Sequence, residues 1–202
     1  MSSINMPYKG SLTREQFLFY EMRIVAQMLI TGKSDSEIID EIYADNTFQY
    51  PTERMLKNIT SVCLRRLYAM EDESLMRVIA MKPVEEAKQV CLYAIMRENR
   101  IMWEFMITVI GEKYRLLDMT FSDSDLNIFF MRLQEQSDIV ASWTESTIKK
   151  MKSVIKRILI ENDYIDSGRS KVLNPVLLSN TLENAIRSNN DLLALPAFNC
   201  FS

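Results

Sequence analysis

The helical character of the chain is plainest in one stretch, which reads Thr144-Glu-Ser-Thr-Ile-Lys-Lys-Met-Lys-Ser-Val-Ile-Lys-Arg-Ile-Leu159. Its apolar residues recur at steps of one, three and four, at Ile148, Met151, Ile155, Ile158 and Leu159. A polar stripe follows another side, at Glu145, Lys149, Lys152 and Lys156, and is widened by Lys150, Ser153 and Arg157. This spacing predicts an amphipathic helix, capped by Ser142 or Thr144 and ending near Asn162, with one apolar side and one basic side.

The composition of the whole chain also favours a helical fold. The sequence has 202 residues, of which only 4 are Gly and 5 are Pro. A β-sandwich or a glycine-looped nucleotide fold normally needs more turn residues than this. The 14 methionines suit helical cores, because their flexible side chains fill irregular gaps. We therefore predict an all-α fold with two helical subdomains, residues 1–82 and 83–202.

Two segments of the chain are similar in sequence. Thr52-Glu-Arg-Met-Leu-Lys-Asn-Ile-Thr-Ser-Val-Cys-Leu-Arg-Arg-Leu67 aligns without a gap on the stretch from Thr144 to Leu159. Both segments follow a short predicted helix and a turn, which predicts two helix-turn-helix-like units. In the second unit, Tyr164-Ile165 and Val172-Leu173 are predicted as strands around a Ser167-Gly168 turn, a small β-hairpin in the position of a wing.

The basic residues of these units are the candidate contacts to DNA. The formal net charge is −3, so the whole molecule has no positive field and a polyanion has to be met by a local patch. The alternative interpretation, a solvated helix surface, stays open for both helices. The predicted DNA-binding residues are Lys149, Lys150, Lys152, Lys156, Arg157, Arg169, Lys171, Arg54, Lys57 and Arg65.

The sequence argues against several kinds of chemistry. It contains no His, which excludes a histidine general base, a Ser-His or Cys-His pair and histidine metal ligation. The three cysteines, Cys63, Cys91 and Cys200, form no CxxC pair and suit a reduced cytoplasmic protein. No glycine-rich phosphate loop occurs. We expect no catalytic residues, no metal, no cofactor and no small-molecule substrate.

The chain carries no predicted membrane segment. Its best apolar run, Phe105 to Ile110, is far shorter than the roughly 20 apolar residues of a membrane span. The N-terminus, Met1 to Gly10, has no apolar signal core, which again favours the cytoplasm. Of the two tryptophans, Trp103 is predicted in the core. Trp143 precedes the basic helix and either packs as a staple, the favoured alternative, or contacts a sugar-phosphate backbone.

Five blocks of the sequence together resemble the BrxA family. They are Glu21 to Ile30, Asn46 to Gln49, Arg65 to Leu67, Glu112 to Asp118 and Ser142 to Lys150. The likeness runs over about residues 12–180, in the order of the family. It implies an all-helical component of the BREX phage-defence system of bacteria, with helix-turn-helix elements, DNA binding and no known enzymatic activity. Older descriptions of the family as an inner-membrane protein disagree with the short apolar runs.

The resulting interpretation is a DNA-binding accessory protein of phage defence. It binds double-stranded DNA through phosphate contacts with little sequence preference, and other BREX proteins are further partners. Two alternatives stay open. One is a protein-interaction scaffold with a methionine-rich helical surface, and the other is an RNA-binding helical bundle.

Overall fold

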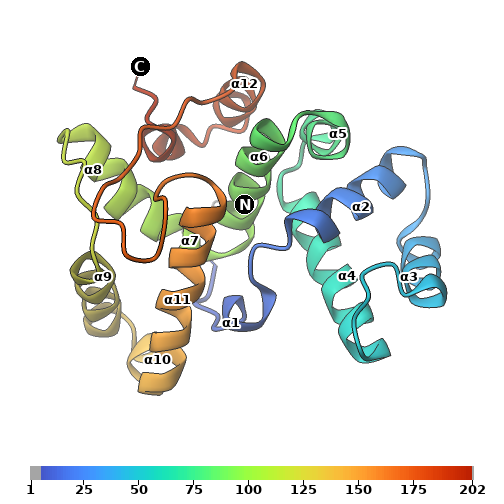
Figure 1. The fold of residues 1–202 in the computed structure, drawn as a ribbon, viewed down its shortest axis with the longest axis horizontal. Helices are drawn as coiled ribbons and strands as arrows, with labels where there is room; N and C mark the ends of the chain where they lie inside the picture. Colours follow the sequence, from blue (N-terminus) through green and yellow to red (C-terminus); the bar gives the residue numbers. More distant parts are fainter. Residues whose placement is uncertain (1–5, 202) are drawn as a thin grey trace. The chain divides into compact units, whose positions relative to one another are not determined.

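The computed structural model describes residues 6–201, which form two compact helical units (Figure 1). One unit is Leu18–Glu98, and the other joins the chain up to Phe17 with the chain from Asn99 onward. Within residues 6–201 the extended backbone pairs only in one isolated bridge, so the all-α prediction is confirmed. The expectation about the N-terminal leader falls partly on residues 1–5, outside the described residues.

The unit Leu18–Glu98 is built on its central helix. Its helices are α2 (Phe19–Ile30), α3 (Asp35–Asp45), α4 (Glu53–Ala69), α5 (Glu73–Met81) and α6 (Val84–Glu98). α4 packs against α2, α3 and α6, while α5 packs against α2 and α6. The start of α4 follows from its sequence, because the side chain of Thr52 accepts the backbone N–H of Met55 at 3.3 Å.

The other unit contains a longer series of elements. They are α1 (Leu12–Glu15), α7 (Arg100–Phe105), the π-helical segment η2 (Met106–Gly111), α8 (Glu112–Arg115), α9 (Asp123–Gln136), α10 (Asp138–Ala141), α11 (Glu145–Glu161), α12 (Asn180–Ser188) and the 3₁₀ segment η3 (Leu192–Phe198). η3 packs against η2. The contact is close at Gly111, where an added Cβ would lie 3.2 Å from the backbone nitrogen of Ala197, tighter than most Cβ contacts.

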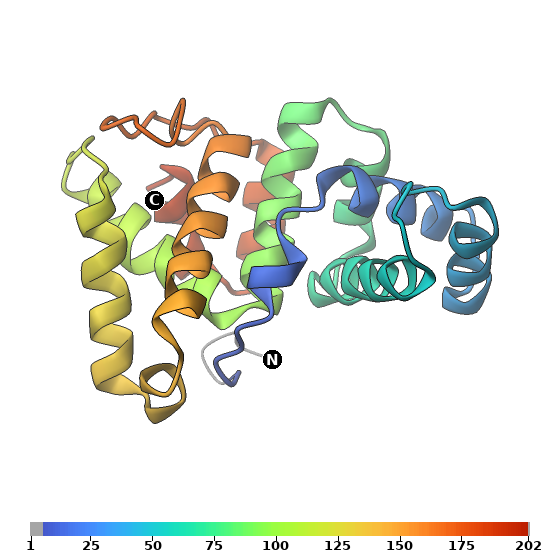
Figure 2. The ribbon, with the colours of Figure 1, turned by 60° about the horizontal axis from the view of Figure 1, so that its bottom comes forward.

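α9 and α11 lie side by side in this unit, with α10 joining them at one end (Figure 2). The Nζ of Lys152 donates to Asn127 at 2.8 Å, and Lys156 pairs with Asp123. These contacts step four residues back on α9 and four residues forward on α11, so the two helices are antiparallel. The predicted helix is confirmed, with Thr144 as its N-cap: its hydroxyl accepts the backbone N–H of Thr147 at 3.2 Å.

The boundary of the compact units differs from the expected division at residues 82 and 83. Pro83 does precede α6, but α6 packs against α4 and α5 and so stays in their unit. The break comes at Asn99, whose extended backbone begins α7. The segment before Phe17 joins the second unit, because α1 packs against α11 and the hydroxyl of Tyr8 donates to Glu104 at 2.9 Å.

The predicted β-hairpin wing is wrong. Residues 163–174 form a loop without strands, in which Tyr164 and Ile165 are both buried. Two successive buried side chains do not fit a hairpin strand, which points alternate residues to opposite faces. The end of the loop pairs with another segment, since Val172 bridges Thr120 and the backbone N–H of Leu173 donates to Met119 at 2.9 Å.

The structure does not support the two predicted helix-turn-helix-like units. Seven residues, 46–52, separate α3 from α4, whereas the helix-turn-helix motif joins its helices by a turn of about 3–4 residues. Before α11, the helix α10 is a single turn of 4 residues. α4 and α11 are therefore similar helices in sequence that follow different connections.

A hydrogen-bond network just before α9 predicts that the stability of the fold depends on pH. The carboxylate of Asp118 accepts from Lys113 Nζ at 2.8 Å and from the hydroxyl of Thr120 at 2.6 Å. These bonds lower the pKa of Asp118 from 3.8 to about 2, the bond from Lys113 most strongly. A carboxylate with a lowered pKa stabilises the fold above its ordinary pKa, and this stability is lost as the pH falls toward about 2.

We therefore expect Asp118→Asn to flatten the dependence of unfolding free energy on pH between 3.8 and about 2. Urea unfolding at a series of pH values, followed by tryptophan fluorescence, measures this dependence in parent and variant. Equal slopes for the two proteins in that interval would contradict the assignment.

Candidate nucleic-acid interface

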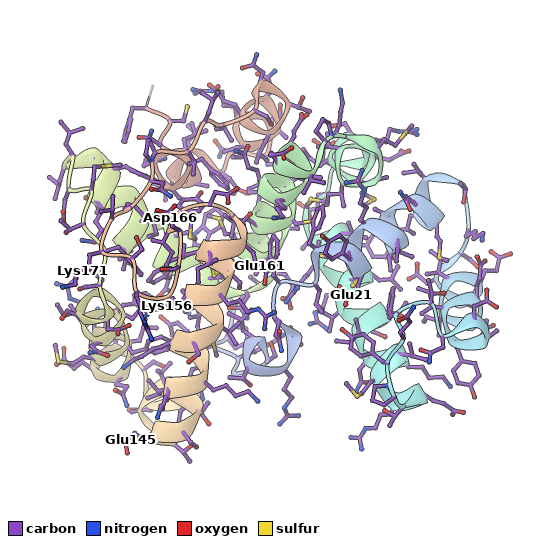
Figure 3. The ribbon with its side chains drawn as sticks, in the orientation of Figure 1. Glu21, Glu145, Lys156, Glu161, Asp166 and Lys171 are labelled. Atoms are coloured by element: carbon purple, nitrogen blue, oxygen red, sulfur yellow. The ribbon has the colours of Figure 1, made fainter. Side chains whose placement is uncertain are left out.

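The outer face of α11 is the most continuous basic surface among the predicted site residues. The exposed residues of this helix after its first turn are Lys149, Lys150, Ser153 and Arg157, at steps of one, three and four. Such steps keep the side chains on one side of the helix. On the other side Ile148, Met151 and Ile155 are buried. The two acids of α11, Glu145 and Glu161, stand near its ends, as Figure 3 shows.

Two of the predicted lysines lie on the flank of α11 rather than at the centre of its outer face. Lys152 and Lys156 are only partly exposed. Lys152 contacts α9 at Asn127, and Lys156 pairs with Asp123 and donates to the carbonyl of Gly168 at 3.3 Å. Lys149, Lys152 and Lys156 therefore do not form the evenly exposed stripe that the sequence predicts. The exposed basic surface of α11 consists of Lys149, Lys150 and Arg157.

The loop after α11 adds two further exposed basic residues, Arg169 and Lys171. Figure 3 labels Lys171 and Asp166 in this loop. The loop is held at both ends, because Lys171 accepts the backbone N–H of Phe121 at 3.0 Å and Asp166 accepts from Asn174 at 2.8 Å. The two side chains are thus presented by an anchored loop without the predicted hairpin.

The remaining predicted residues belong to α4, in the other unit. Arg54 and Lys57 are exposed, and the Nζ of Lys57 lies 4.9 Å from the ring centroid of Tyr43. Arg65 forms an ion pair with Glu98 at 2.7 Å, and only 6% of the Glu98 side chain is exposed. Removal of Arg65 would leave a buried carboxylate uncompensated, so this arginine supports the fold. Arg54 and Lys57 remain the candidate contacts on α4.

Two hollows flank α9, and their charges differ. One, of about 370 Å³, is lined by the carboxylates Glu104, Glu112 and Asp125. Its two cations are Arg132 and Lys113, and Lys113 is paired with Asp118 and with Asp125, at 2.8 and 3.0 Å. The other, of about 880 Å³, lies between α9 and the start of α11 and includes Lys149 and Lys152. A phosphate group is favoured on the α11 side, where the lysines are.

The second hollow contains residues that the sequence did not single out. Asn127 and Gln134 line it from α9, opposite Trp143 and Lys149. They stand at least nine residues before Trp143 and belong to no motif, so only the antiparallel packing of α9 on α11 brings them there. Trp103 is buried as predicted, whereas Trp143 is partly exposed, at the wall of the hollow.

The structure also bears on metal, thiol and membrane chemistry. Within residues 6–201, no group of three or more acidic or cysteine side chains is placed to hold a metal ion. Burial raises the pKa of the Cys91 thiol, which disfavours the nucleophilic thiolate. In the same residues, every helix is too short or too polar to cross a lipid bilayer.

Comparisons with known proteins match nearly the full length of the chain. The family model BrxA matches residues 6–190. A BREX protein BrxA of Bacillus cereus (strain H3081.97) is 36% identical over 186 residues, covering 91% of this chain and 92% of that protein. One of Escherichia coli O9:H4 (strain HS) is 24% identical over 169 residues, covering 84% and 79%.

A solved structure extends the likeness to the fold. The crystal structure of an uncharacterized protein from Magnetospirillum magneticum superposes with a TM-score of 0.80 at 20% identity, covering 95% of this chain and 97% of that chain. At this identity the match concerns the fold alone. The family model and the relative from Bacillus cereus carry the assignment: the chain belongs to the BrxA family.

Proposed function

We propose that this protein is a DNA-binding component of a bacterial BREX phage-defence system, and that it binds the double helix through phosphate contacts with little sequence preference. The observation that carries the proposal is the exposed row of Lys149, Lys150 and Arg157 on α11. Contacts to phosphate give affinity without reading sequence. The names of its relatives, BREX protein BrxA, support the role in this system.

The distribution of charge supports a local contact. α11 carries five basic residues against two acids, on a chain whose formal net charge is −3. The anchored loop adds Arg169 and Lys171 beyond the end of this helix. In the other unit, α4 carries two exposed basic residues of its own, Arg54 and Lys57. The protein acts by binding, with no catalytic step, and other BREX proteins are its further partners.

The salt dependence of binding tests this mechanism. If about six basic side chains meet phosphates, the logarithm of the association constant falls with the logarithm of salt concentration at a slope near −5, from about −0.9 per phosphate. Gel-shift titrations of a mixed-sequence duplex across salt concentrations measure the slope. Duplex RNA and single strands of the same sequence are the comparison ligands. A slope near zero, or tighter binding of the RNA, would contradict the proposal.

A protein-interaction scaffold is the second candidate, and one observation favours it. Large apolar side chains are exposed in the segment from α8 to α10, with Leu116, Leu117 and Met131 at 74%, 83% and 53% exposure. Large exposed apolar side chains are available for contacts to another protein. This function predicts binding to another BREX protein that is insensitive to substitutions on the outer face of α11.

A further inference from the structure

The groove between α9 and the start of α11 brings Lys149 of the outer face together with groups that do not belong to that face. Its walls include Asn127 and Gln134 from α9, Trp143 from the turn before α11, and Lys149 and Lys152 from the first turns of α11. Its volume of about 880 Å³ lies in the range of roughly 300–1,000 Å³ that is usual for small-ligand sites. The lining combines an aromatic ring, two amides and two ammonium groups.

The aromatic ring distinguishes this groove from an ordinary basic surface. Trp103 is 3% exposed and belongs to the core, whereas Trp143 is partly exposed at the groove wall. An exposed indole ring offers a flat face on which a nucleobase stacks, whatever the sequence. The amides of Asn127 and Gln134 each offer donors and an acceptor, the groups that proteins use on the edges of bases.

The charged side chains of the groove favour a phosphate group close to the ring of Trp143. Lys152 Nζ donates to Asn127 Oδ1 at 2.8 Å, which leaves two ammonium hydrogens and the amide NH₂ of Asn127 for other acceptors. Glu145 also lines the groove and is the acid among its described lining residues. It stands one helical turn before Lys149, so an anionic group is favoured on the side of the two lysines.

We infer that this groove holds one unpaired nucleobase of a DNA strand whose phosphates lie on the outer face of α11. The inference rests on the proposed DNA binding and adds a preference among DNA structures. The base stacks on Trp143, its edge meets Asn127 and Gln134, and its phosphate meets Lys149 and Lys152. A paired base inside a duplex does not enter, because its faces are covered by neighbouring bases and its edge by the complementary base.

Affinities for matched duplexes test the inference on the full chain. The ligands are a blunt duplex, the same duplex with one unpaired thymidine, and a thymidine oligonucleotide. We expect the unpaired thymidine to tighten binding by about 5- to 150-fold, the range for one base stacked on an aromatic ring. Trp143→Ala should remove most of this gain and leave blunt-duplex affinity unchanged, whereas Trp143→Phe should keep it.

Tryptophan fluorescence gives a second measurement that needs no alanine variant. The chain has two tryptophans, and a base stacked on Trp143 quenches its emission while the buried Trp103 stays unaffected. The oligonucleotide should quench the parent but not Trp143→Phe. Equal affinity of the parent for the two duplexes, or equal quenching of parent and Trp143→Phe, would overturn the inference. Weak binding of the blunt duplex would overturn only the proposed duplex function, because the quenching by the oligonucleotide is measured separately.

Discussion

Replacing Lys149, Lys150 and Arg157 together by alanine should lower the affinity for duplex DNA by about 500-fold at about 0.1 M monovalent salt, if each side chain meets one phosphate. The salt slope should flatten by about 2.7, from about 0.9 per phosphate, and unrelated sequences should weaken alike. Arg157 is paired with Glu161 at 3.1 Å, but an exposed pair at this spacing is weak, so its guanidinium remains able to bind phosphate.

The control for this variant removes the same charge elsewhere. Arg115, Arg132 and Arg187 are exposed and belong to the same compact unit as α11. Their joint replacement by alanine should change duplex affinity far less, because salt screens charges that do not touch the phosphates. Gel shifts of both variants, each checked as folded by circular dichroism, compare the two surfaces. Equal losses would show a general charge effect and contradict a site on α11.

The local signals in the sequence predicted the helices well. Thr144, one of the two predicted caps, does cap α11, and the apolar residues of α11 face the core. These features depend on residues within one or two helical turns, so they can be read directly from the chain. The predicted wing is wrong because the burial of Tyr164, Ile165 and Leu173 comes from packing within the unit, and the pairing partner of residues 171–173 lies near Thr120.

The sequence predicted the candidate site only in part, because some of its contacts join residues that are far apart in the chain. Helical spacing placed Lys149, Lys150 and Arg157 on an exposed side, which the structure shows. Helical spacing does not predict that Lys152 and Lys156 contact α9, because their partners Asn127 and Asp123 are far away in sequence. The groove beside Trp143 likewise exists only once α9 and α11 are packed together.

The packing of α7, α9 and the segment before α9 depends on one aromatic cluster. Phe105 is fully buried, and its ring lies 5.3 Å from that of Phe129 and 6.5 Å from that of Phe121, in edge-to-face geometry. Phe129 belongs to α9, which forms one wall of the groove, and the backbone of Phe121 donates to the loop at Lys171. Phe105 therefore supports both the groove and the anchored loop.

Phe105→Ala should lower the unfolding free energy of this unit by about 3–5 kcal/mol, because it removes the buried ring and leaves a cavity between helices that relax only partly. Urea unfolding followed by tryptophan fluorescence reports this unit, since Trp103 and Trp143 both lie in it. The control is Phe201→Ala: its ring is 51% exposed, and its loss should cost no more than about 0.5 kcal/mol. Similar unfolding curves for the two variants would contradict the central position of Phe105.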